Sequence, residues 1–112
     1  MPADSVRALR RVHDLLLDPD KHTRRALARD REDNPCCPGD REACKFCVLG
    51  ALDWVIFNGD YSNPTRAWDI AVLALGGAAE IALFNDKARY ADILPRIAKA
   101  ADILEKEGLA AI

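Results

Sequence analysis

Apolar residues near the start of the chain recur at three- and four-residue steps. This spacing is typical of one buried helix face, and the residues that show it are Val6, Leu9, Val12 and Leu16. Pro19 ends the pattern, because the residue before a proline is pushed away from helical backbone angles. The sequence therefore predicts an amphipathic first helix.

The next segment, residues 18–42, carries a weaker apolar signal, and we call it the arm. Residues 21–29 fit a short second helix. Residues 30–40 contain Asn34-Pro35 and Pro38-Gly39, which are typical of loops. We therefore expect the arm to be rich in loop.

The most apolar segment comes after the arm. It predicts a helix that begins with Asp40 as its N-cap and ends near Phe57. Few polar residues interrupt this helix, so we expect it to be the central and most buried one. Gly50 lies inside it, where a glycine costs about 1 kcal/mol relative to alanine. We expect a neighbouring helix to approach closely at that position.

Turn residues divide the rest of the chain into further helices. Asn63-Pro64 is typical of an N-cap followed by proline at the first helical position, and Gly76-Gly77 ends the helix after it. A shorter helix over residues 78–84 is predicted to end at Asn85-Asp86.

The last helix is predicted to begin with Asp92 as its cap, which places Pro95 in the first turn, and to end at Gly108. Its inner face is formed by Ile93, Ile97, Ala100, Ala101 and Leu104. No segment alternates in the manner of a strand. The sequence therefore predicts a single all-α domain over residues 1–112, a compact bundle of four to five helices with no significant sheet.

The composition is that of a folded domain. Half of the 112 residues are apolar and 30% are charged, and the formal net charge is −2, so overall charge predicts neither a nucleic-acid nor a membrane partner. No apolar run approaches the ~18–20 residues that span a bilayer. Arg7, Arg10 and Arg11 interrupt the N-terminal segment, which therefore does not resemble a secretory signal. We expect a cytoplasmic protein with reduced thiols.

Four cysteines form a candidate chemical site: Cys36, Cys37, Cys44 and Cys47. Cys44 and Cys47 share a face of the predicted helix, and the adjacent pair lies in the loop upstream. Four thiolates could therefore meet at one tetrahedral zinc ion, with His22 able to replace one of them. The adjacent pair is unusual, because zinc sites more often join two C-x-x-C segments.

Other roles for the thiols remain open from the sequence. A disulfide could join Cys36 or Cys37 to Cys44, and a redox sensor is a variant of that arrangement, because a helix N-terminus lowers the pKa of a thiol. Cys47 taken alone is better interpreted as a small core residue, because a buried free cysteine behaves as an apolar side chain.

Asn85-Asp86 is the other polar feature. The pair could present an amide and a carboxylate to a ligand, or orient a catalytic Cys47 paired with His13 or His22. We favour a structural role, because asparagine is a frequent helix C-cap and Asp86 can cap the next segment of the chain. A catalytic role is disfavoured, because Cys47 lies on the apolar face of its predicted helix.

The arm also carries a basic stretch that begins at Lys21 and ends at Arg31. Acidic residues flank it closely, and no aromatic residue is interleaved to stack on bases. We interpret this stretch as a solvated face and not as a nucleic-acid site.

Three segments of the chain occur in a characteristic order. They are Ala26-Leu27-Ala28-Arg29-Asp30, Phe46-Cys47-Val48-Leu49-Gly50-Ala51-Leu52 and Phe84-Asn85-Asp86, followed by an apolar C-terminal helix. This order resembles a family of small uncharacterised bacterial and phage proteins over about residues 5–105. The resemblance implies a helical fold and no particular activity. Cys36, Cys37 and Cys44 depart from the family pattern, so chemistry that needs all four cysteines would be peculiar to this chain or a subgroup.

Two functions of different classes are consistent with these observations. We favour a non-catalytic protein-interaction or regulatory module, because no acid, base and nucleophile converge in the sequence. Its partner, another protein or a second copy of the chain, would contact the arm or the aromatic residues Tyr61 and Tyr90. The alternative is a zinc-linked or redox-linked protein that uses the four cysteines.

Overall fold

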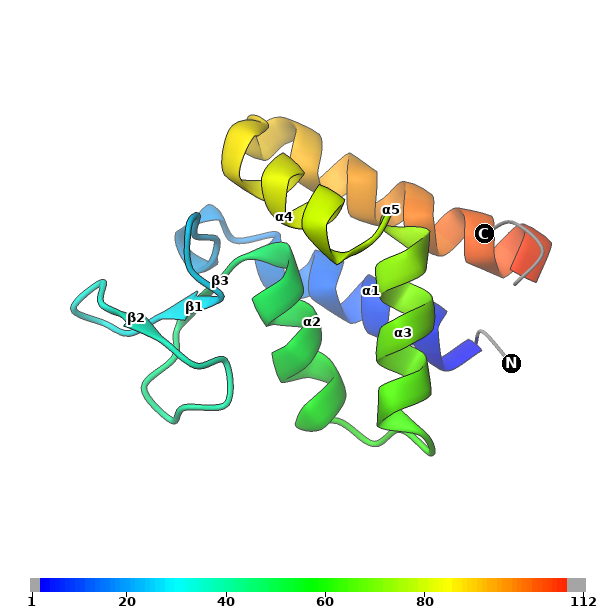
Figure 1. Ribbon diagram of the computed structural model, residues 1–112, viewed down its shortest axis with the longest axis horizontal. Coiled ribbons are helices and arrows are strands. Elements are labelled where there is room, and N and C mark those ends of the chain that lie inside the picture. Colours follow the sequence, from blue (N-terminus) through cyan, green and yellow to red (C-terminus); the bar gives the residue numbers. More distant parts are fainter. Residues whose placement is uncertain (1–2, 109–112) are drawn as a thin grey trace.

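The computed structural model describes residues 3–108, as five α-helices, one 3₁₀ turn and three two-residue strands (Figure 1). The elements are α1 (Ala3–Leu16), η1 (Pro19–Lys21), β1 (Ala28–Arg29), β2 (Pro35–Cys36), β3 (Lys45–Phe46), α2 (Val48–Phe57), α3 (Pro64–Ala74), α4 (Ala78–Lys87) and α5 (Tyr90–Glu107). Five helices agree with the prediction. The small sheet corrects the all-α class without significant sheet, and the fold is mostly helical instead.

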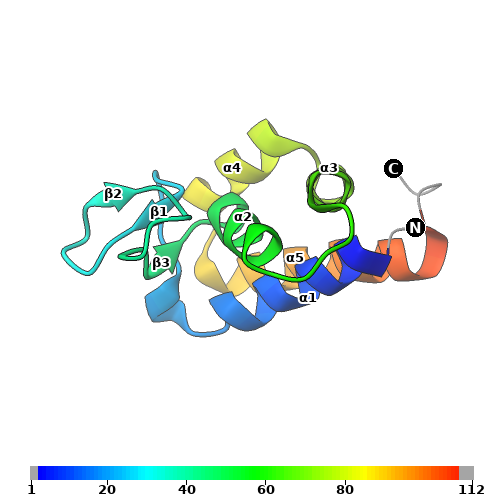
Figure 2. The same ribbon diagram turned by 90° about the horizontal axis from the view of Figure 1, so that it is seen from below.

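Helices α1 and α5 lie antiparallel and side by side along the long axis of the molecule (Figures 1 and 2). Helices α2 and α3 pack over them, α4 packs against α2 and α3, and the arm lies at one end. The predicted inner faces of α1 and α5 are confirmed as buried: Val6, Leu9, Val12, Leu16, Ile93, Ile97, Ala100, Ala101 and Leu104. Removing this apolar surface from water, at about 25 cal/mol per Å², supplies the main favourable term for folding.

The central helix is shorter than predicted. α2 begins at Val48, with Cys47 and not Asp40 as its N-cap. The residues before it pair with the strand segment of the arm: the amide of Cys44 donates to the Arg29 carbonyl (2.9 Å), and the amide of Cys47 donates to the Leu27 carbonyl (3.1 Å). These backbone groups cannot also form the hydrogen bonds of a helix, so the residues just before Val48 belong to β3 and not to α2.

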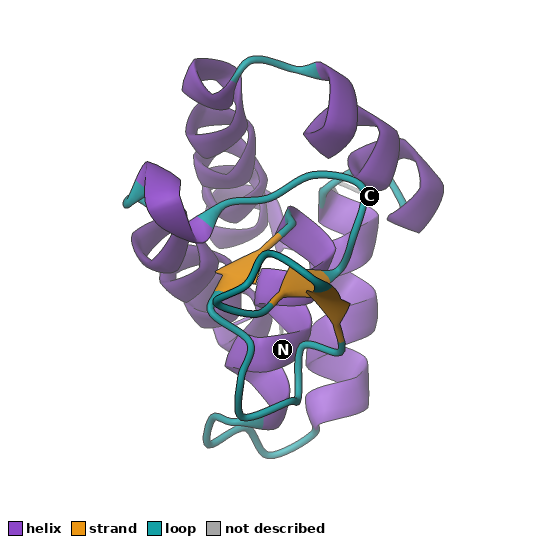
Figure 3. Cartoon of the chain, turned by 90° about the vertical axis from the view of Figure 1, so that its left-hand side faces the viewer, coloured by secondary structure: helices purple, strands orange, loops and turns teal. Residues whose placement is uncertain are grey.

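Residues 21–29 of the arm do not form the predicted α-helix. Lys21 ends the 3₁₀ turn, Arg25 adopts a left-handed φ of 64°, and β1 comes next. The three strands form an antiparallel sheet in the order β2-β1-β3, in which Ala28 pairs with Cys36 on one side and with Phe46 on the other (Figure 3). Two-residue strands are too short for an alternating pattern, so the sequence carried no readable strand signal.

The predicted start and end of α3 are confirmed. The Asn63 side chain accepts a hydrogen bond from the amide of Arg66 as an N-cap, and Pro64 occupies the first turn. Gly76 and Gly77 come after the helix with φ of 102° and 100°. Such positive φ values end a helix and favour glycine.

Helices α4 and α5 differ from the prediction at their junction. α4 continues to Lys87, so Asn85-Asp86 lies inside the helix and is not its C-cap. α5 begins at Tyr90 and not behind Asp92, which places Pro95 beyond the first turn. Gly108 is the C-cap, as predicted. Among residues 3–108 no single helix is long and apolar enough to cross a membrane. Taken together, α3 and α4, with a bend of 60° between them, have the length and composition of a span.

Gly50 allows the arm to pass directly over α2. A Cβ atom placed at this position would lie 1.8 Å from the carbonyl oxygen of Leu27. The close neighbour is therefore the backbone of the arm and not a neighbouring helix, as the sequence had led us to expect. Because the contact is with backbone, no side-chain rotation can relieve it.

We predict that Gly50→Ala destabilises the protein by about 2–3 kcal/mol, because the arm must shift away from α2. Gly39→Ala is the matched control, since a Cβ there meets nothing within 4 Å. Urea unfolding of both variants measures the effect. Equal unfolding free energies for the two variants would contradict the close packing described.

Candidate functional site

Asn85 is the polar centre of the junction between the arm, α2 and α4. Only 1% of its surface is exposed. Its Oδ1 accepts hydrogen bonds from the Val48 amide (3.0 Å) and from Nε2 of His22 (2.8 Å). Its Nδ2 donates to the Thr23 carbonyl (3.1 Å) and to Oδ1 of Asp86 (3.2 Å). An asparagine amide offers two donors and two acceptor positions, so all four are used.

A second set of polar contacts joins the arm to the end of α4, and the end of α1 to the start of α5. Oδ1 of Asp86 accepts from the amide of Arg25 (2.9 Å), at the residue with the left-handed φ. The Arg24 guanidinium donates to the Ala88 carbonyl (2.6 Å). The Tyr90 hydroxyl donates to the Leu17 carbonyl (2.9 Å). Asn85 and Asp86 therefore make tertiary hydrogen bonds within the chain and do not cap α4.

Two of the basic residues of the arm, Arg24 and Arg29, contribute to the same junction. Arg29 donates to the Thr23 hydroxyl (2.9 Å) and to the carbonyls of Arg24 (3.1 Å) and Asp33 (3.0 Å). Guanidinium groups used in this way stabilise the irregular backbone of the arm. This role differs from the solvated face that the sequence predicted for the whole stretch.

His22 is held in one tautomer by its partner. The Thr23 carbonyl can only accept a hydrogen bond, so the Asn85 atom that faces it must be the donor Nδ2. The acceptor Oδ1 therefore faces His22, and Nε2 of the ring must carry the proton. Burial lowers the pKa of His22 below its ordinary 6.5, and the nearby Arg24 lowers it further, against an opposing hydrogen bond to Asn85.

Cys47 lies at the edge of this junction. Its sulfur accepts a hydrogen bond from the Gly50 amide (3.3 Å) as the α2 N-cap, and only 6% of the residue is exposed. Burial raises the pKa of the thiol. A hollow of about 240 Å³ lies beside it, and Leu27, Leu49 and Asp86 are among its lining residues.

Cys47 and His22 are not joined as a thiol and its base in this structure. His22 and Asn85 are arranged like a catalytic base and the group that orients it, with 2.8 Å between Nε2 of His22 and Oδ1 of Asn85. However, no hydrogen bond among residues 3–108 joins the Cys47 sulfur to His22, and burial keeps the thiol protonated. A thiol nucleophile needs an adjacent base and a lowered pKa. The arrangement therefore lacks the link that would activate the nucleophile.

The four cysteines do not share one environment. Cys47 is buried, Cys37 is exposed, and Cys36 and Cys44 are half-buried, all as free thiols. Cys44 precedes β3, so it does not share a helix face with Cys47 as predicted. Within residues 3–108, no group of three or more His, Cys, Asp or Glu side chains is placed to hold a metal ion. The zinc site, with His22 as substitute ligand, stays a prediction.

The two tyrosines predicted to form a partner surface are engaged within the chain. Tyr61 is 7% exposed, and the Arg7 guanidinium lies over its ring at 4.3 Å. The Tyr90 hydroxyl binds the carbonyls at the end of α1. Neither ring is the exposed aromatic patch that the sequence had led us to expect.

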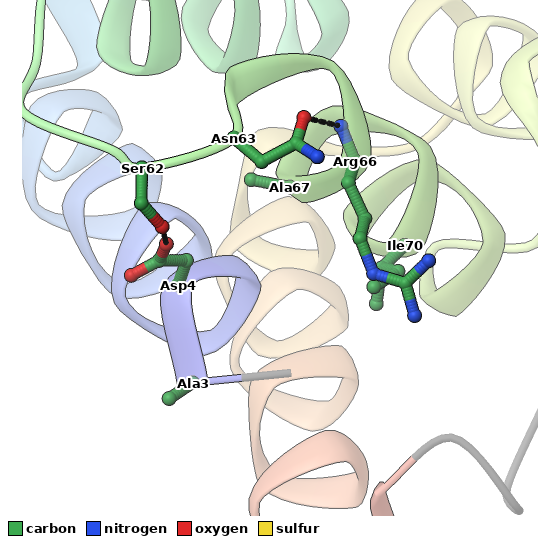
Figure 4. A pocket seen from close by; sticks show the side chains of 7 residues that line it. All are labelled: Ala3, Asp4, Ser62, Asn63, Arg66, Ala67 and Ile70. Atoms are coloured by element: carbon green, nitrogen blue, oxygen red, sulfur yellow. Dashed lines mark hydrogen bonds between the residues drawn. The ribbon is translucent and has the colours of Figure 1, made fainter. Parts of the chain in front are cut away.

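Another hollow lies where the N-termini of α1 and α3 meet, with a volume of about 350 Å³ (Figure 4). Two hydrogen bonds lie among its lining residues: the Ser62 hydroxyl donates to Asp4 (3.3 Å), and the Asn63 side chain accepts from the Arg66 amide (3.1 Å) (Figure 4). These contacts fix the turn before α3.

The hollow with the most distinctive chemistry lies between α2 and α3. It has a volume of about 250 Å³ and is lined by Asp53, Phe57, Thr65 and Trp68. The apolar pattern did not reveal this site, because its lining residues come from two helices whose crossing no local pattern specifies. The four-residue spacing of Leu49, Asp53 and Phe57 along α2 was the available signal.

Comparison with known proteins places the chain in a family. Residues 1–103 match the family described as "Family of unknown function (DUF6197)". This chain belongs to that family. The match to DUF6197 covers the arm, the Asn85 junction and most of α5. No curated protein and no solved structure matches the chain.

The lowered pKa of His22 predicts a pH dependence of stability. Below pH 6.5 the unfolded state takes up a proton more readily than the folded state, so the free energy of unfolding falls as the pH decreases from 6.5 and levels off below the folded pKa. His22→Gln is the control, because its amide nitrogen can donate to Asn85 without titrating. In urea unfolding from pH 7.5 to 5, wild type should lose stability relative to this variant. Parallel curves would refute the buried neutral imidazole.

The cysteine environments predict an order of thiol reactivity. Cys37 should react first with an aromatic disulfide reagent, and Cys47 at least about 100-fold more slowly, because it is buried and its thiol remains protonated. Mass spectrometry of the labelled peptides measures both rates, and zinc analysis of protein purified without chelator accompanies it. Rapid labelling of Cys47 would contradict its burial. One bound zinc per chain, with protection of all four thiols, would establish the metal site.

Proposed function

We propose that this domain is a non-catalytic protein-interaction module that binds its partner through the outer side of α2 and the adjoining side of α3. We call this surface the α2–α3 face and define it by Asp53, Trp54, Phe57, Thr65 and Trp68. The proposal is carried by one observation: α2 is apolar at every position except Asp53, yet Trp54 and Phe57 remain 38% and 55% exposed.

A helix that is apolar on all sides is normally buried on all sides. The chain buries α2 on the sides that face α1, α3 and α4, and Leu27 covers it at Gly50. The remaining side carries two large aromatic residues in water. A partner that covers this side would complete the burial of α2, which is a favourable use of apolar area.

The residue types of the α2–α3 face also support an interface. Tryptophan and other aromatic residues are enriched at the centres of protein interfaces and supply much of the binding energy there. Phe57 and Trp68 line one hollow, so a partner side chain can enter between them. The remaining polar network, around Asn85, is used internally and supports this face by fixing where α2 begins.

A photo-crosslinking residue placed at Phe57 tests the proposal in the host cell. We expect one discrete adduct from position 57 and none from Leu17, a matched control that is 59% exposed but lies outside the α2–α3 face. The adduct is identified by mass spectrometry, and the identified protein is then purified. Phe57→Glu and Trp68→Glu should each weaken its binding at least about tenfold, as expected for interface centres, while Leu17→Glu should not.

Three outcomes would overturn the proposal. They are no adduct at position 57, the same adducts at positions 57 and 17, or binding that is unchanged by both glutamate variants. An adduct between two copies of the chain, supported by sedimentation, would identify the partner as a second copy.

A further inference from the structure

The hollow of the α2–α3 face combines one carboxylate with two aromatic side chains. Asp53 and Phe57 come from successive turns of α2, and Thr65 and Trp68 come from successive turns of α3. Each pair is three or four residues apart, so each presents neighbouring side chains to the gap between the helices. The hollow measures about 250 Å³, which is suited to one side chain and not to a large cofactor.

Asp53 has no partner for its charge among residues 3–108. It takes part in none of the side-chain hydrogen bonds or ion pairs of this part of the chain, unlike Asp4, Asp33 or Asp92. Burial alone raises the pKa of this carboxyl, with no neighbouring charge acting on it. A half-buried carboxylate without compensation costs folding free energy, and a cation from outside the chain would remove that cost.

We infer that the hollow formed by Asp53, Phe57, Thr65 and Trp68 receives the ammonium group of a lysine side chain of the partner protein. Aromatic faces attract a cation through the ring quadrupole, tryptophan most strongly, and Asp53 supplies the opposite charge. Asp53 and the Thr65 hydroxyl belong to different helices. Such divided acceptors suit the rotatable N–H groups of an ammonium ion more than the planar fork of a guanidinium ion.

This inference rests on the proposed function and names the partner's contribution at the centre of the α2–α3 face. The apolar stem of a lysine would lie against Phe57, which is the exposed wall of the hollow. The surrounding face would bind apolar residues of the same partner. The predicted partner segment therefore carries a lysine among apolar residues.

A titration with n-butylammonium, the analogue of a lysine side chain, tests the inference on the isolated protein. The two tryptophans give separate indole N–H signals in a ¹⁵N-correlated NMR spectrum. We expect the Trp68 signal to shift saturably and the Trp54 signal, whose ring packs against Phe46 at 5.8 Å, to stay in place. n-Butanol, a neutral probe of similar shape, should produce no saturable shift.

Two variants decide whether Asp53 supplies the charge. Asp53→Asn should weaken binding of n-butylammonium up to about fivefold, which is the scale of one partly exposed ion pair. Asp69→Asn is the matched control, because it removes the same charge from the exposed surface next to Trp68 in the chain. Unchanged binding in Asp53→Asn, or equal weakening in both variants, would overturn the inference.

Two further titrations distinguish the classes of ligand. Tighter binding of n-butylguanidinium would assign the hollow to arginine, and tighter binding of tetramethylammonium would assign it to a quaternary ammonium ligand; either result overturns the lysine assignment. The titration needs no partner protein. An adduct at position 57 together with a failed titration would therefore reject the lysine and leave the interaction module intact.

Discussion

The fold depends on the four hydrogen bonds of the Asn85 side chain. One buried amide joins the arm at His22 and Thr23, the first residue of α2 at Val48, and the carboxylate of Asp86 on its own helix. Each bond alone is worth about 0.5–1.5 kcal/mol, but leaving a buried donor or acceptor unpaired costs about 1–3 kcal/mol. The network therefore specifies one arrangement of three segments, because any other would leave buried polar groups without partners.

This constraint positions α2 and explains why part of it stays exposed. With the arm held against α4, its Leu27 backbone covers Gly50 and its strand pairs with β3, so α2 begins at Val48. The arm covers α2 only at its N-terminal end. The opposite end carries the partly exposed Trp54 and Phe57, and Asp53 and Phe57 line one hollow together with residues of α3. The same packing that shields Cys47 thus produces the apolar face through which we propose that the domain binds a partner.

The sequence predicted the helices that have long periodic patterns or clear turn residues. The inner faces of α1 and α5, the Asn63 cap and the end of α3 before Gly76 depend on local chemistry that one sequence displays. The arm was not predictable in this way, because its structure depends on contacts between residues far apart in the chain, such as Arg25 with Asp86. The start of α2 was misplaced for the same reason. The backbone amides of Cys44 and Cys47 donate hydrogen bonds to the arm, and the spacing of apolar residues cannot reveal such contacts.

The candidate sites were also predictable only as far as they depend on residues close together in the sequence. Asn85-Asp86 was recognised as a polar pair, but the sequence suggested a local cap, whereas its partners in the arm lie about sixty positions away in the chain. The hollow at Asp53 needed the crossing of α2 and α3, which no local pattern specifies. The cysteine spacing suggested a metal site from proximity in sequence; the structure shows Cys47 as a buried helix N-cap and Cys37 as exposed, and the zinc site stays a prediction.

Amide hydrogen exchange of Asn85→Ala tests the role of this side chain most directly. The substitution should increase exchange at Arg25, Cys44, Cys47 and Val48, because the arm and the start of α2 are released, and should reduce the free energy of unfolding by about 2–4 kcal/mol. Amides in the middle of α1 and α5 should still exchange only through global unfolding. Wild-type protection of the arm in this variant would contradict the conclusion that Asn85 holds the three segments together.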